Sequence, residues 1–272
     1  MFRTRLGARH VGVALVGIGG VLGAVRFRSR RGVRKCRRSL RAERAGDESF
    51  DPGSVSALPA PARRYLEHAI DPGRPLARRV ELTMAGEFRF GDRWCPFEAE
   101  ETLAARRGFL WEPTVRLGPG LWFSGVDFYV DGEGGQRFFL DGLLPVVRAG
   151  GPAVDRSSAG RFLAESVWLP TSLLPAMGAE WETVDDDRAR VSLPGVDEPL
   201  TLTVGGDGAL RSVKTMRLDG GTGERRPFGA VVESERTVDG VTVPWEVEVG
   251  WETEAGEFEP FFRAELREAA FG

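Results

Sequence analysis

The stretch RVELTMAGEFRF (Arg79–Phe90) decides the fold of this chain, because apolar and polar side chains alternate along it. Val80, Leu82, Met84 and Phe88 stand at even positions, and most of the odd positions between them carry charged or hydroxyl side chains. Successive side chains of a β-strand point to opposite faces of its sheet. The pattern therefore predicts a long strand with one buried face and one polar face.

Similar alternation recurs further along the chain. The later segments that show it are residues 97–103, 109–117, 126–130, 200–204 and 241–249. Asp-Gly steps, which favour two-residue type I′ hairpin turns, stand between the predicted strands. They begin at Asp131, Asp141, Asp207, Asp219 and Asp239. Together these features predict a mainly β fold with minor α content: an antiparallel curved sheet or half-barrel of about ten to twelve strands.

Two segments have helical rather than strand character. In LPAPARRYLEHAI (Leu58–Ile70), apolar residues fall on one helical face, which predicts a helix before the sheet. The segment Asp155–Pro175 predicts a short two-part helical insertion, with Ser157 or Ser158 as its N-cap and Pro170 ending its first part. Such an insertion would cover one face or one mouth of the curved sheet.

The charge is divided unevenly along the chain. Residues 1–46 contain 13 Arg or Lys and one acidic residue, whereas the rest contains 24 basic and 39 acidic residues. The division predicts three parts: an apolar and basic leader (1–46), a polar linker (47–57) and a single β-rich domain (58–272).

The leader contains one apolar run, Val11–Val25, bracketed by Arg9 and Arg26. A membrane span usually needs about 20 residues, so the run predicts a short single-pass anchor whose flanking arginines reach the interface. Ten basic residues follow between Arg26 and Arg44, and the positive-inside rule then predicts a cytoplasmic domain. The alternative is a cleaved signal peptide with a secreted or extracytoplasmic domain, but no Ala-x-Ala cleavage site follows.

The basic stretch Arg26–Arg44 predicts binding to anionic lipid headgroups, worth about 1 kcal/mol per charge near the surface. Nucleic-acid binding is not expected, because the attached domain is acidic and carries no nucleic-acid-binding motif. The sequence leaves the oligomeric state open.

Four segments, LPAPARRYLEHAI, WCPFEAEETLAARRGFLWEP, AESVWLPTSLLP and WETVDDDRARVSL, resemble a broad prokaryotic family of unknown function. The resemblance covers roughly Leu58–Phe271 and implies an N-terminal membrane anchor, a basic linker and a β-rich domain. It implies no activity. The family pattern tends to carry Gln where this chain has Glu101. The expected fold is also similar to lipoprotein-carrier (LolA-like) half-barrels, at the level of fold alone.

The residues point to little chemistry. His10 and His68 are the only histidines, and Cys36 and Cys95 form no paired ligand spacing, so no metal site is expected. The Gly-rich segments lack a P-loop lysine, and no cofactor is expected. No catalytic residues can be assigned, because no G-x-S-x-G motif is present and no spacing selects a pair of carboxylates.

Arg161 and Glu165 stand four residues apart on the predicted insertion, where they can form an ion pair. Large aromatic residues on a curved sheet could line an apolar pocket beneath that helix. The candidate ligand-binding residues are Trp111, Asp127, Tyr129, Arg161, Glu165 and Trp168.

Three functional hypotheses follow. The first is a membrane-tethered domain that binds a lipid or another apolar small molecule. The second is a non-enzymatic scaffold at the membrane, for which we expect a filled interior. The third is a carboxylate-dependent hydrolase, which requires two acidic groups in one cleft.

Overall fold

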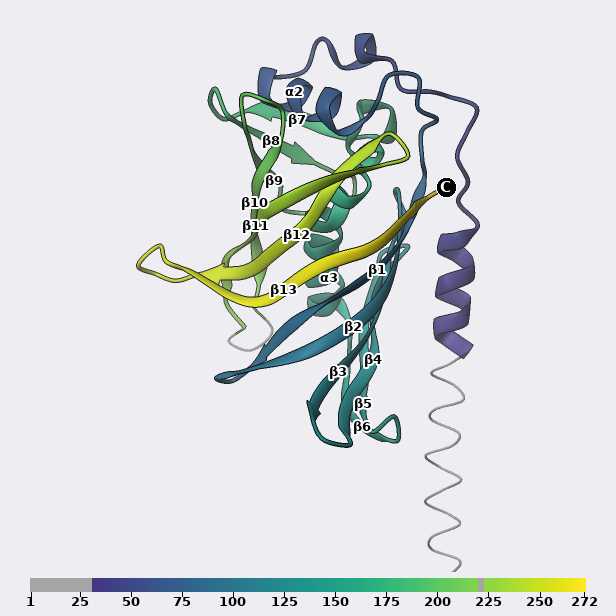
Figure 1. Ribbon diagram of the computed structural model, residues 1–272, viewed down its shortest axis with the longest axis vertical. Helices are drawn as coiled ribbons and strands as arrows, with labels where there is room; N and C mark the ends of the chain where they lie inside the picture. Colours follow the sequence, from purple (N-terminus) through teal and green to yellow (C-terminus); the bar gives the residue numbers. More distant parts are fainter. Residues whose placement is uncertain (1–30, 220–222) are drawn as a thin grey trace, which may run out of the picture.

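The computed structural model describes residues 31–219 and 223–272, in which thirteen strands form one antiparallel sheet (Figure 1). The strands are β1 (Arg79–Phe90), β2 (Arg93–Ala104), β3 (Gly108–Gly118), β4 (Leu121–Val130), β5 (Glu133–Leu140), β6 (Leu144–Gly150), β7 (Glu180–Thr183), β8 (Arg188–Ser192), β9 (Leu200–Val204), β10 (Leu210–Leu218), β11 (Arg225–Val238), β12 (Val241–Glu252) and β13 (Phe258–Phe271). The predicted fold class, a curved antiparallel sheet, is confirmed.

Two meanders meet in the middle of the sheet. The strand order is β6-β5-β4-β3-β2-β1-β13-β12-β11-β10-β9-β8-β7, so the first and the last strand pair with each other. Their register runs from Val80 opposite Phe271 to Phe88 opposite Phe262. The strands β6 and β7 form the two edges and do not pair within the described part of the chain, which leaves the curved sheet unclosed.

Three predicted Asp-Gly turns have the expected backbone. Asp131, Asp141 and Asp239 adopt φ angles of 54°, 48° and 49°, and each following glycine also has a positive φ. Two successive positive φ angles define the type I′ turn, whose twist matches that of the adjoining strands. These turns close the hairpins β4–β5, β5–β6 and β11–β12.

The sheet wraps around α3 (Pro152–Glu165), which lies against its concave face (Figure 1). Three 3-10 turns follow it: η2 (Ser166–Trp168), η3 (Pro170–Leu173) and η4 (Pro175–Met177). The two-part insertion is therefore present. The predicted N-cap at Ser157 or Ser158 is wrong, because α3 begins at Pro152 after Gly151, whose φ is 97°. Proline suits the first turn of a helix, where its missing N–H leaves no bond unmade.

The helix predicted before the sheet is α2 (Ala60–Ala69), which buries Tyr65 and Leu66 against β8, β9 and β12. The preceding segment 47–57, predicted to be a linker, contains the turn η1 (Pro52–Val55). It lies on the domain, with Phe50 and Val55 buried and the Phe50 N–H bonded to the Arg74 carbonyl oxygen at 2.8 Å.

Part of the basic leader also packs on the domain. Residues 31–41 form a helix on the convex face of the sheet (Figure 1), where Leu40 is fully buried against Leu110 and Val126. Its guanidinium groups pair with carboxylates that point outward from the strands, Arg37 with Glu112 and Arg41 with Glu81. The basic helix therefore packs against the polar face of the alternating strands.

The apolar run Val11–Val25 lies outside the described residues. Within residues 31–219 and 223–272, no helix has both the length and the apolar character needed to span a membrane.

Candidate functional site: a cavity beneath α3

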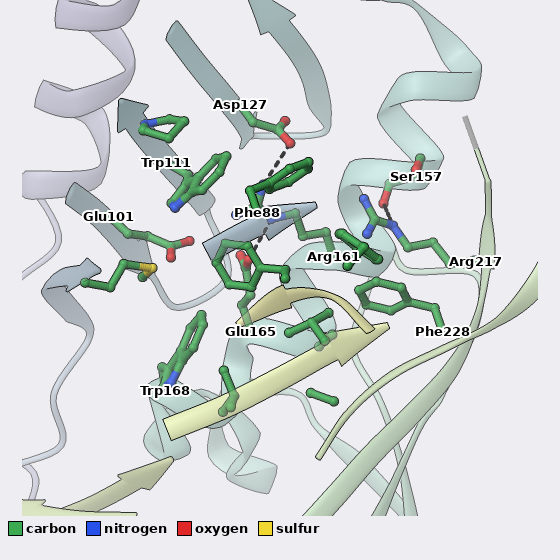
Figure 2. Close-up of a pocket in the computed structure, with 18 of the residues that line it drawn as sticks. Phe88, Glu101, Trp111, Asp127, Ser157, Arg161, Glu165, Trp168, Arg217 and Phe228 are labelled. Carbon is green, nitrogen blue, oxygen red and sulfur yellow. Dashed lines mark hydrogen bonds and ion pairs between the residues drawn. The ribbon is translucent and has the colours of Figure 1, made fainter. Parts of the chain in front are cut away.

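A cavity of about 440 Å³ lies between α3 and the concave face of the sheet (Figure 2). The inward positions of the alternating strands supply most of its wall, which is why the wall is largely apolar and aromatic. Its larger side chains include Phe88, Trp111, Phe138, Phe228, Trp251 and Phe262. The cavity is therefore built by the same strand pattern that defines the fold.

The aromatic side chains pack in a connected group around Phe262. Its ring stacks on Phe97 at 4.8 Å between centroids and meets the edges of Trp111 and Phe88 at 6.0 and 6.2 Å. The register of β13 shifts opposite Val249 and Gly250, and both Phe261 and its neighbour Phe262 line the cavity. A β-bulge of this kind redirects side chains that would otherwise alternate.

Arg161 projects from α3 into the cavity wall and binds two carboxylates. Its Nη1 lies 2.8 Å from Asp127 Oδ2, and its Nε lies 2.6 Å from Glu165 Oε1. The guanidinium also sits over the rings of Phe109 and Trp111, 4.6 and 4.7 Å from their centroids. Burial lowers the pKa of Arg161, but attraction to Glu165 and Asp127 outweighs burial and raises it overall, so the group is a permanent cation.

The strand register places polar residues side by side beneath this arginine. Glu101 on β2 faces Trp111 on β3, which faces Asp127 on β4, which faces Gln136 on β5. The Gln136 amide donates a hydrogen bond to Asp127 Oδ2 at 3.2 Å. Four neighbouring strands thus supply a row of side chains that is polar at three of its four positions, Glu101, Asp127 and Gln136.

Glu101 is the most unusual member of this row. It is 2 % exposed, and neither carboxyl oxygen accepts a hydrogen bond from a protein donor. Burial raises the pKa of Glu101 well above its ordinary value, and the negative charge of Glu165 raises it further. The two carboxyl groups can share a hydrogen bond when one of them carries a proton. Glu101 therefore keeps its proton to a higher pH than an exposed glutamate does.

Arg217 is a second cation in the wall, on β10. Its Nε donates to the Ser157 carbonyl oxygen at 3.1 Å, and its guanidinium lies over the Phe228 ring at 4.7 Å. Burial, with repulsion from Arg161, lowers the pKa of Arg217 to about 10. The group is still a cation at neutral pH.

The structure brings five of the six candidate residues into the cavity wall: Trp111, Asp127, Arg161, Glu165 and Trp168. The predicted pair of Arg161 and Glu165 is present. Trp168 donates from its indole nitrogen to the Pro244 carbonyl oxygen at 3.0 Å, which holds η2 against β12. The sixth candidate, Tyr129, is not part of the cavity wall. Its ring packs against that of Phe162 on α3, with 5.9 Å between the centroids.

Sequence reasoning overlooked Glu101, Arg217 and Phe262 as cavity residues. For Glu101 a signal existed, because it follows Phe97 and Ala99 in steps of two and precedes Leu103. A carboxylate at an inward position of an apolar strand face is expensive to bury and points to a special environment. Nothing in the sequence indicated that Arg217 and Phe262 would meet this site.

The cavity favours one of the three functional hypotheses over the other two. A scaffold was expected to have a filled interior, so the open cavity favours ligand binding. For the hydrolase hypothesis, Asp127 and Glu165 are both engaged in ion pairs with Arg161 rather than free to act as an acid and a base. Among the described residues, no three His, Cys, Asp or Glu side chains are grouped as metal ligands would be.

Comparisons with known proteins give a family and a weak likeness of fold. The model of a family of unknown function (DUF6920) matches residues 56–271. No curated protein matches the sequence. A LolA superfamily protein from Nitrosomonas europaea is similar in structure with a TM-score of 0.45 and 8 % identity, over 79 % of this chain and 94 % of that one.

Two further solved structures are similar to a lower degree. One is a putative outer membrane lipoprotein-sorting protein domain from Vibrio parahaemolyticus, with a TM-score of 0.41 and 9 % identity over 71 % of this chain and 85 % of that one. The other is a DUF1329 family protein from Desulfovibrio piger, with a TM-score of 0.38 and 11 % identity over 82 % of this chain and 94 % of that one.

Proposed function

The chain belongs to the DUF6920 family of unknown function, and we propose that its domain binds a lipid or another apolar small molecule in the cavity beneath α3. The observation that carries the proposal is the cavity itself, about 440 Å³ with a largely aromatic wall. Ligand pockets occupy roughly 300–1,000 Å³ and combine apolar walls with a few polar groups. The row from Glu101 to Gln136 supplies such groups.

The close packing of the rest of the domain supports the proposal that a ligand fills the cavity. Protein interiors are close-packed and contain few voids larger than a water molecule. Elsewhere in the domain, large side chains such as Tyr65, Phe109 and Leu163 are almost completely buried. A cavity of this size in such a core is a feature that a ligand would fill, since apolar surface gains free energy when it leaves water.

Filling the cavity with a larger side chain should weaken ligand binding. Ala230 lines it from β11, and Ala230→Trp is expected to lower the affinity for an uncharged naphthyl dye by at least about tenfold, or 1.4 kcal/mol. The indole would occupy space that the dye needs. The measurement is a fluorescence titration of purified protein, preceded by native mass spectrometry of any ligand that co-purifies.

The matched control is Ala270→Trp, which adds the same side chain at an exposed position of β13. We expect it to leave the dye affinity unchanged. Wild-type protein that carries no co-purified ligand and takes up no dye would contradict the proposed function.

We further propose that the leader tethers this domain to the membrane. Val11–Val25 would form the anchor, and Arg34, Lys35 and Arg38 are exposed on the docked helix, where they could meet anionic headgroups. Each such charge contributes about 1 kcal/mol near an anionic surface. The ion pairs of Arg37 and Arg41 are made within the domain, so the lipid-binding role falls to the exposed cations.

A reporter fused to the C-terminus tests on which side of the membrane the domain lies. A fluorescent protein fused after Gly272 is expected to fluoresce in the cytoplasm, and the full chain is expected to stay in the membrane fraction after a high-salt wash. A phosphatase that folds only outside the cytoplasm should be inactive at the same position. An active phosphatase would place the domain outside and support signal cleavage instead.

A further inference from the structure

We propose that the ligand of this cavity is a cationic amphiphile, an ammonium group on an apolar tail, and that Glu101 binds the ammonium. The inference rests on the proposed function, because it names the class of ligand for the same cavity. It comes from the charges and contacts of the wall.

The charged groups of the wall are unequal in number. Glu101, Asp127 and Glu165 are acidic, and only Arg161 and Arg217 are basic. With every group ionised, the wall carries one uncompensated negative charge. Burying an unpaired charge is costly, so the cavity is complementary to one additional positive charge.

The contacts show which acid has no ion-pair partner. Asp127 and Glu165 each hold an ion pair with Arg161. Arg217 bonds to the Ser157 carbonyl oxygen and lies over Phe228, and Figure 2 shows it on the opposite side of Arg161 from Glu101. Glu101 is left with two buried oxygens that accept no bond from a protein donor.

The groups around Glu101 define its response to pH. Glu165 and Arg161 act on it from α3 and Asp127 acts on it from β4, while Arg217 on β10 is the remaining charge in the wall. Burial and Glu165 raise the pKa of Glu101, so in the empty cavity a proton neutralises it. When an alkylammonium ion binds, that proton leaves Glu101 for solvent, and the carboxylate pairs with the ligand. Charge balances, and no other bond forms or breaks.

The neighbourhood of Glu101 suits an organic cation. Trp111 is its cross-strand partner, and that ring already has one organic cation, the Arg161 guanidinium, 4.7 Å from its centroid, with the Phe262 ring 6.0 Å away in the same wall. Aromatic faces attract ammonium groups, and the attraction grows when water is excluded. A metal ion would require a larger group of ligands than the described residues provide at this place.

The test uses ligands that share one tail. Dodecylamine and dodecanol differ only in the head group, and both are titrated against the full-length protein by displacement of the uncharged dye. Because binding of the amine releases a proton, its affinity should rise with pH, by up to about tenfold per pH unit, for as long as Glu101 stays protonated in the empty cavity. The affinity for dodecanol should not change. Calorimetry in two buffers of different protonation enthalpy should show release of protons with the amine only.

Glu101→Gln is the test variant, because the amide has the same shape, carries no charge and can donate to Glu165. It should lower the affinity for dodecylamine by at least about tenfold at about pH 8 and remove the pH dependence, while the affinity for dodecanol stays within about threefold. Glu100→Gln is the matched control, since the neighbouring side chain is exposed on the other face of β2. It should behave as wild type.

The variant should also fold. A carboxyl group whose pKa is raised in the folded state contributes stability at low pH that is lost as pH rises through the folded pKa. Glu101→Gln should therefore be at least as stable as wild type at about pH 8, which an unfolding curve checks.

Three results would overturn the inference while binding of dodecanol kept the proposed function standing. They are unchanged dodecylamine affinity in Glu101→Gln, no proton release with the amine, and a preference for dodecanoate over dodecylamine. If no member of the series binds, including dodecanol, the proposed function itself fails.

Discussion

Replacing Arg161 by leucine is expected to destabilise the domain by about 3–5 kcal/mol, because it removes one partner of a buried charge cluster. Asp127 is 5 % exposed, and the side chains of Arg161 and Glu165 are 15 % and 12 % exposed in their ion pair. Without the guanidinium, both carboxylates lose their cation in a largely buried site. The stacking over Phe109 and Trp111 is lost as well.

Urea unfolding of the purified protein measures this effect. The triple variant Arg161→Leu, Asp127→Asn, Glu165→Gln should regain much of the lost stability, because it leaves no unpaired charge of this cluster buried. Arg211→Leu is the matched control, since Arg211 pairs with Asp207 at 2.7 Å with both side chains more than half exposed. It should cost at most about 1 kcal/mol. Equal losses for Arg161→Leu and Arg211→Leu would show that the cavity cluster is effectively solvated.

The sequence predicted those features that local periodicity controls. The alternation in Arg79–Phe90 and the Asp-Gly turns indicated the curved antiparallel sheet, and the spacing of Arg161 and Glu165 indicated their ion pair. Each of these depends on neighbours within a few residues of each other. Asp127 as the second partner of Arg161 was not predictable, because the strand register and the docking of α3 bring together residues 34 positions apart.

Other parts of the site depend on departures from periodicity. The bulge in β13 lets both Phe261 and Phe262 line the cavity, whereas strict alternation assigns consecutive residues to opposite faces. The docking of residues 31–41 depends on Glu81 and Glu112, which lie on separate strands and face the same way only in the folded sheet. A charge run read alone indicates a solvated or membrane-facing segment.

Phe262→Ala is expected to cost about 3–5 kcal/mol, the range for removing a buried aromatic side chain. The phenylalanine is 8 % exposed and holds Phe97, Trp111 and Phe88 together, so its loss removes ring contacts in three directions. Phe258→Ala on the same strand is the control, because Phe258 is 38 % exposed. It should cost no more than about 1 kcal/mol in urea unfolding.

The change in the unfolding midpoint of Phe262→Ala on addition of ligand shows whether the cavity binds an apolar molecule. Truncation enlarges the apolar space beside Glu101, and an apolar molecule that enters only the folded state stabilises it by mass action, about 2.7 kcal/mol at a concentration 100 times its Kd. Dodecanol should therefore raise the unfolding midpoint of Phe262→Ala at least as much as that of wild type, since the added volume can receive its tail. A midpoint that rises in wild type but not in the variant would mean that the ring of Phe262 itself forms the binding surface. A midpoint that rises in neither would leave the aromatic group with a packing role alone.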